Sequence, residues 1–81
     1  MLKVYGSMLC PDCVACREKY DAAGIAYEYL DFSDALINLK EFLAIREGNP
    51  IFDEIRQKGG IGIPCVVKPD GIITLDWESC M

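Results

Sequence analysis

The stretch Leu2-Lys3-Val4-Tyr5-Gly6-Ser7-Met8-Leu9-Cys10-Pro11-Asp12-Cys13 decides the fold, because a short apolar segment leads directly into two cysteines three positions apart. Proline fits the first position of a helix, where its missing N–H needs no partner. The stretch therefore predicts a strand at residues 2–5 and a helix at about 11–23. Cys10 would then stand at the helix N-terminus, where unpaired N–H groups and the positive end of the dipole stabilise a thiolate.

The spacing of the two thiols is compatible with a disulfide. On a helix, residues i and i+3 have Cα atoms roughly 5 Å apart, which lies within the range that a disulfide tolerates. Asp12 places a negative charge beside Cys10, so we expect it to weaken the stabilisation of the thiolate and to make the pair more reducing. Cys10 and Cys13 are the candidate catalytic residues.

The remainder of the chain alternates between further helices and strands. Gly24 ends the first helix, and the alternation in residues 25–31 predicts a second strand. Ser33 is a candidate N-cap for a helix through Arg46, with an apolar stripe at helical spacing formed by Leu36, Leu39, Phe42 and Leu43. Asn49-Pro50 begins a short helix at 51–57, and residues 65–68 and 72–75 are two strands joined by a turn.

This order of elements, βαβα(α)ββ, predicts a single α/β domain over residues 1–81. A strand–helix–strand start makes the first two strands parallel, and the final hairpin is antiparallel, so the four-stranded sheet is mixed. The chain leaves room for only a short C-terminal helix, or none.

Composition narrows the chemistry further. The 81 residues include five cysteines and no histidine, which excludes catalytic triads and zinc sites that depend on histidine. A net charge of −5 makes nucleic acid and anionic membranes poor partners, and no segment approaches the roughly 20 apolar residues of a membrane span. Because the N-terminus has no secretory signal, we expect a cytoplasmic protein whose cysteines are catalytic or metal-binding.

A second motif, Gly59-Gly60-Ile61-Gly62-Ile63-Pro64-Cys65, precedes the third strand. Taken with the element order and the Cys10-Pro11-Asp12-Cys13 motif, it resembles the glutaredoxin-like proteins of the thioredoxin-fold superfamily over about residues 2–76. The family's Cys-Pro-Tyr-Cys is matched except at Asp12. Its Thr-Val-Pro, whose proline follows a cis peptide bond, is matched at Pro64.

The resemblance implies a thioredoxin-like (glutaredoxin-type) fold and a thiol–disulfide oxidoreductase working in cell redox homeostasis and electron transport. Cys10 would attack a disulfide of a protein or small molecule, and Cys13 would resolve the mixed disulfide. Pro11, Ile63 and Pro64 would bind the substrate, with the Ile63 backbone holding it as an added strand.

The resemblance also implies a monomer without a tightly bound cofactor. The electron donor is left open between glutathione and a reductase. Ser7 and Ile61 stand where the family often has Lys and Arg, and residues 74–78 lack its Gly-Gly pair.

Cys16 suggests a different class of function, because it extends the cysteine motif to Cys10-x-x-Cys13-x-x-Cys16. These three thiols, with Cys65 as a candidate fourth ligand, could form a zinc or iron–sulfur binding module. The alternative interpretation of Cys16 is a small apolar side chain buried on the inner face of the first helix. A redox-inert interaction domain is a third possibility.

Overall fold

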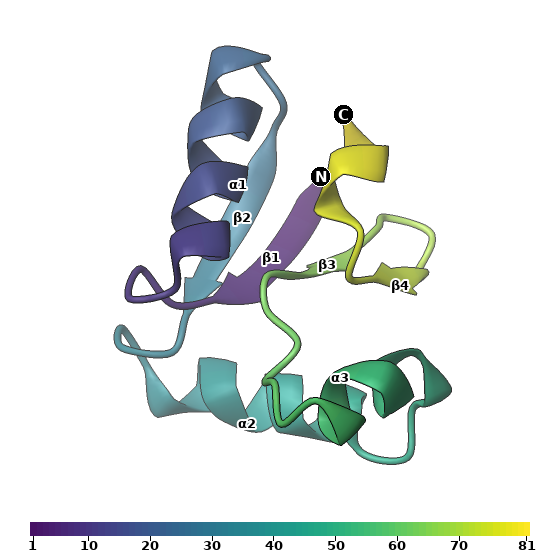
Figure 1. Ribbon diagram of the computed structural model, residues 1–81. Coiled ribbons are helices and arrows are strands. Elements are labelled where there is room, and N and C mark those ends of the chain that lie inside the picture. Colours follow the sequence, from purple (N-terminus) through teal and green to yellow (C-terminus); the bar gives the residue numbers. More distant parts are fainter.

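The computed structural model describes all residues from Met1 to Met81. A four-stranded mixed sheet forms its centre, with strand order β2-β1-β3-β4 (Figure 1). The elements follow in the order β1 (Leu2–Gly6), α1 (Pro11–Ala22), β2 (Tyr27–Asp31), α2 (Leu36–Arg46), η1 (Pro50–Phe52), α3 (Asp53–Gln57), β3 (Cys65–Val67), β4 (Ile73–Thr74) and η2 (Trp77–Cys80). The predicted α/β class and element order are confirmed.

The pairing of the strands also agrees with the sequence pattern. β1 runs parallel to β2 and antiparallel to β3, and β3 runs antiparallel to β4. β1 is therefore a central strand, hydrogen bonded on both sides, and its carboxyl end leads into the segment that carries Cys10. The predicted parallel start and antiparallel hairpin are both present.

Helices cover both faces of the sheet, with α1 and η2 on one side and α2 and α3 on the other (Figure 1). A hydrophobic cluster lies on each face of the sheet, and neighbouring residues of β1 belong to different clusters because side chains alternate across a strand. Val4 packs with Cys16, Tyr20 and Val66 beneath α1. Tyr5 faces the opposite way and packs with Phe42, Phe52 and Cys65.

The start of α2 differs from the sequence prediction. The helix begins at Leu36, its N-cap position is held by Ala35 without a side-chain cap, and Ser33 does not cap it. The Asp31 carboxylate accepts a hydrogen bond from the Ser33 N–H at 2.7 Å, and the Asp31 carbonyl accepts one from Asp34. This local turn engages the N–H groups of Ser33 and Asp34, and the helix begins two residues later than a Ser33 cap would place it.

The predicted apolar stripe of α2 is only half correct. Phe42 is fully buried and Leu39 packs beside it, but Leu36 and Leu43 are exposed. Ile45 occupies the inner face instead. Leu36 is the first residue of the helix, and its side chain is left largely in solvent.

The end of the chain forms the short 3₁₀ helix η2, which agrees with the expectation of a short C-terminal helix or none. Tyr20 anchors it by donating from its hydroxyl to the Trp77 carbonyl at 2.6 Å. Cys80, near the C-terminus, packs against the core beneath α1. None of the helices combines the length and the apolar character needed to cross a membrane.

Candidate functional site

Cys10 occupies the N-cap position of α1, as the sequence predicts. Its backbone is extended and its side chain makes no capping hydrogen bond, while its carbonyl accepts the N–H of Val14 at 3.1 Å. The residue is partly exposed, and its sulfur lies 4.0 Å from the carbonyl oxygen of Ile63. The two sequence motifs, 53 positions apart, therefore meet at this sulfur.

Cys13 lies one turn along α1 and is fully buried. Burial raises the pKa of its thiol to about 12, and the adjacent Cys10 thiol contributes to the rise. The chain approaches Cys13 closely at Gly6, where an added Cβ would stand 2.7 Å from the Cys13 sulfur and 2.9 Å from the Tyr29 hydroxyl. The glycine at the end of β1 thus makes room for a protonated thiol behind Cys10.

The Ile63–Pro64 peptide bond is cis, as predicted. Pro64 is buried, whereas Ile63 is half-buried and faces Cys10. The N–H of Ile63 makes no hydrogen bond within the protein. Just before it, Gly62 has a φ of +94° and lies so close to Phe52 that a Cβ would come within 2.6 Å of the ring, so only glycine fits there. Pro11 is exposed at the first position of α1.

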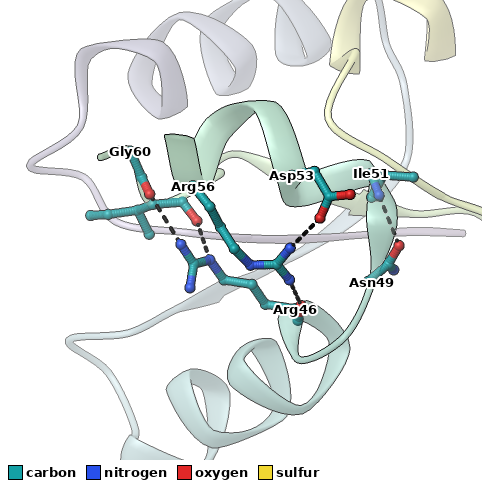
Figure 2. Close-up of polar contacts among 7 residues, drawn as sticks. Arg46, Asn49, Ile51, Asp53, Arg56 and Gly60 are labelled. Atoms are coloured by element: carbon teal, nitrogen blue, oxygen red, sulfur yellow. Dashed lines mark hydrogen bonds and ion pairs between the residues drawn. The ribbon is translucent and has the colours of Figure 1, made fainter. Parts of the chain in front are cut away.

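Arg46 supports this loop and was missed by the sequence analysis. From the last turn of α2 its Nε donates to the Ile61 carbonyl at 3.0 Å and its Nη2 to the Gly60 carbonyl at 3.1 Å (Figure 2). Arg56 in turn donates to the Arg46 carbonyl and to the Asp53 carboxylate. A basic residue in the last turn is normal helix chemistry, so the sequence carried no signal for this second role.

Two hollows of about 400 Å³ each adjoin the Cys10 sulfur. Together they form what we call the Cys10 groove, lined by Ser7, Leu9, Cys10, Asp12, Phe32, Ile55, Gly59, Gly60, Ile61, Gly62 and Ile63. Most of this lining is apolar or glycine. Its one charged side chain is Asp12, and no lysine or arginine reaches it.

Lys58 directly precedes the loop that begins at Gly59, but it is not among the residues that line the Cys10 groove. Its ammonium pairs with the Glu54 carboxylate at 2.9 Å, and this pair lowers the pKa of Glu54. The lining of the groove therefore offers no cation to a bound anion.

The four-cysteine metal site does not fit the structure. Cys16 is buried with Val4 and Tyr20 on one face of the sheet, whereas Cys65 is buried with Tyr5 and Phe42 on the other. No group of three or more cysteine or carboxylate side chains converges in a way that could hold a metal ion. Burial raises the pKa of Cys16 to about 11 and that of Cys65 to about 12, as expected of thiols packed in a core.

Part of the chain is similar in sequence to a known bacterial protein. No family model matches the chain, and no solved structure matches it significantly. A protein of Haemophilus influenzae described as uncharacterized is 33% identical over 67 residues, which cover 83% of this chain and 78% of that protein. The chain therefore belongs to the same family as this Haemophilus influenzae protein.

Proposed function

We propose that the protein is a glutaredoxin-like thiol–disulfide oxidoreductase that works by dithiol exchange between Cys10 and Cys13. One observation carries the proposal: a partly exposed sulfur at a helix N-terminus opens onto an apolar groove, with a second thiol buried one turn behind it. Cys10 stands at the N-cap position of α1, partly open to solvent and so accessible to a substrate disulfide. The raised pKa of Cys13 keeps that sulfur protonated until it is needed.

The arrangement of the chain supports a thioredoxin-like fold. Four features agree with it: the strand order β2-β1-β3-β4, the parallel β1–β2 pair, the dithiol after β1, and the Ile63-Pro64 loop before β3. The approach of the Ile63 carbonyl to the Cys10 sulfur supports a role for that loop in holding substrate. An unpaired N–H beside the nucleophile can take up an extended chain as an added strand.

The reaction proceeds in two exchanges. The Cys10 thiolate attacks one sulfur of the substrate disulfide, the substrate S–S bond breaks, and the first substrate thiol leaves with a proton from water. The Cys13 sulfur then attacks Cys10 of the mixed disulfide. The Cys10–Cys13 bond forms, the bond to the substrate breaks, and the second substrate sulfur takes up the proton that Cys13 releases.

Two electrons must be returned to the Cys10–Cys13 disulfide by an external thiol, either glutathione or the dithiol of a reductase. No tightly bound cofactor enters this cycle. We further propose a monomer acting in the cytoplasm, since a reducing compartment keeps exposed thiols such as Cys10 available.

Turnover of 2-hydroxyethyl disulfide and of insulin, measured with glutathione and with a thioredoxin reductase as alternative donors, tests the proposal. The Cys10→Ser variant should lose both activities, and Cys13→Ser should lose insulin reduction. Cys80→Ser is the matched control, because it removes a partly exposed thiol outside the Cys10 groove. Full activity of Cys10→Ser would refute the proposal.

A further inference from the structure

The first inference concerns the substrate and rests on the proposed function. Large apolar side chains line the Cys10 groove but are left in water: Leu9 is 90% exposed and Ile61 is 58% exposed. The two hollows of the Cys10 groove share Cys10, Ile61 and Ile63, so the nucleophile lies within one continuous apolar surface. Covering such a surface with an apolar partner is favourable in proportion to the area removed from water.

The charges of the groove disfavour an anionic occupant. Asp12 is the one charged residue of the lining, and the protein carries a net charge of −5. The cations nearest to the loop are already engaged, Arg46 with the Gly60 and Ile61 carbonyls and Lys58 with Glu54. A carboxylate brought to Cys10 would meet repulsion without a counter-charge.

We infer that the substrate is a protein disulfide in an extended segment, with apolar residues beside the attacked cysteine and no carboxylate close to it. The free N–H of Ile63 pairs with the backbone of that segment, and the apolar neighbours cover Leu9 and Ile61. Glutathione disulfide, whose carboxylates would lie in the groove, is by this reasoning a poor substrate.

Matched peptides test this inference. Each carries one cysteine, flanked by leucines in one peptide and by glutamates in the other, and linked by a disulfide to 2-mercaptoethanol. Single-turnover rates with the reduced protein are divided by the rates with dithiothreitol, which corrects for the intrinsic reactivity of each disulfide. Glutathione disulfide is measured in the same way.

The leucine-flanked peptide should react at least tenfold faster than either the glutamate-flanked peptide or glutathione disulfide. Ile61→Ser should reduce the ratio of the leucine-flanked rate to the glutamate-flanked rate. Asp12→Asn should raise the rate of the glutamate-flanked peptide. Ile72→Ser, at a site 55% exposed in the turn between β3 and β4, is the control and should leave the ratio unchanged. Equal rates, or a preference for glutathione disulfide, would overturn the inference while leaving the proposed function intact. Failure to reduce even 2-hydroxyethyl disulfide would overturn both.

A second inference rests on a different observation, the buried hydroxyl of Tyr29. This oxygen is shielded from solvent and has no hydrogen-bond partner in the structure, which is rare for a buried polar group. It lies beneath Gly6, in the same small space as the Cys13 sulfur. Burial and the adjacent Cys13 raise the pKa of Tyr29, so the hydroxyl keeps its proton and remains a donor at neutral pH.

The structure assigns to Tyr29 the role of hydrogen-bond donor to the Cys13 thiolate during resolution of the mixed disulfide. A hydrogen bond donated by the Tyr29 hydroxyl as the Cys13 proton leaves would lower the pKa of Cys13, against the effect of burial. Tyr29 retains its own proton throughout, and the proton of Cys13 leaves with the substrate thiol. Arg17, whose guanidinium lies 4.4 Å from the centre of the Tyr29 ring, fixes the ring in place.

Removing only the hydroxyl tests this role, which also depends on the proposed function. Tyr29→Phe should slow the resolution of a Cys10 mixed disulfide about tenfold, since hydrogen bonds to charged groups are the strong ones. In a Cys13→Ser background, where only the first attack occurs, it should leave the rate unchanged. Tyr5→Phe is the control, because the Tyr5 hydroxyl donates to Glu41 on the other face of the sheet, away from Cys13.

A purely structural tyrosine would give a different result. Losing an unpartnered buried hydroxyl should leave the free energy of unfolding unchanged or raise it, so slow resolution together with undiminished stability supports the assignment. If Tyr29→Phe resolves at the parental rate, or slows both exchanges equally, the assignment is wrong. If Cys10 still attacks the substrate disulfide at the normal rate in the Tyr29→Phe, Cys13→Ser protein, the proposed function stands whether or not the Tyr29 assignment is right.

Discussion

The Nε atom of Arg46 donates a hydrogen bond to the carbonyl oxygen of Ile61 at 3.0 Å, across the space between α2 and the loop that faces Cys10. A second bond from the same guanidinium reaches Gly60. Two parallel donors fix both the position and the orientation of a peptide segment, which a single ammonium group cannot do. Arg46 therefore acts as a positioning residue for Ile63, two residues further along.

Replacing Arg46 by lysine should raise KM for a peptide disulfide several-fold while changing kcat less. The charge remains, but the two-pronged contact with the loop is lost, so the Ile63 backbone is held less firmly. Steady-state kinetics with the leucine-flanked peptide measures the effect, and Lys40→Ala, on the exposed side of α2, is the control. If KM and kcat of Arg46→Lys both equal the parental values, the guanidinium does not position the loop.

Adding one methyl group at Gly6 should destabilise the protein and slow resolution. The new Cβ would stand 2.7 Å from the Cys13 sulfur, and overpacking of this kind costs roughly 1–3 kcal/mol. Urea unfolding of Gly6→Ala measures the loss. Gly60→Ala, whose Cβ would approach Ile55 no closer than 3.4 Å, should lose less, and equal losses would contradict the close approach at Gly6.

The five thiols should differ sharply in their reaction with iodoacetamide at pH 7.5. Cys10 and Cys80 are partly exposed, whereas Cys13, Cys16 and Cys65 are buried with pKa values raised to about 12, 11 and 12. Peptide mapping of the reduced native protein should find the label at Cys10 first and at Cys80 next. Rapid labelling of Cys13 before unfolding would contradict its burial.

Stability should fall as the pH rises above about 9. Burial raises the pKa of Tyr5 from 10.0 to about 12, with Glu41 adding to the rise. Burial also raises the pKa values of the three buried thiols, Cys13, Cys16 and Cys65, above their usual 9.0. The folded protein therefore binds more protons than the unfolded chain in this range. The stabilisation that these groups give to the folded protein is complete below their pKa values in the unfolded chain. It is lost as the pH rises through their folded pKa values, up to about 12.

Urea midpoints at pH 7.5, 9.5 and 10.5, taken in the presence of reductant, measure this dependence. Tyr5→Phe removes one of the titrating groups and should give a shallower decline. A midpoint that is constant or increases up to pH 10.5 would show that these groups are not buried as described.

The sequence predicted the parts of the molecule that local chemistry determines. Proline after Cys10, glycine after the first helix, and Asn49 before Pro50 each act within a few residues, and the elements they mark are present. The start of α2 was predicted wrongly because Asp31 organises a turn here, accepting hydrogen bonds from the N–H groups of Ser33 and Asp34. Two nearby polar residues cannot be ranked as caps without the geometry of the turn.

The candidate site was predictable only as two separate motifs. Spacing identified Cys10, Cys13 and the Ile63-Pro64 segment, but their meeting depends on the sheet, which joins β1 to β3. The roles of Arg46 and Tyr29 depend on contacts between elements distant in the chain. Neither residue type carries a local pattern that marks it, so tertiary structure was needed to find them.

The most direct test of the account is to trap the mixed disulfide. Cys13→Ser, reduced and then mixed with 2-hydroxyethyl disulfide, should accumulate one stable adduct, and mass spectrometry of its peptides should locate the adduct on Cys10. Stoichiometric adduct at Cys10, absent from the protein with Cys13 intact, is the result that the account predicts. Adduct on Cys80 alone, or none on any cysteine, would contradict it.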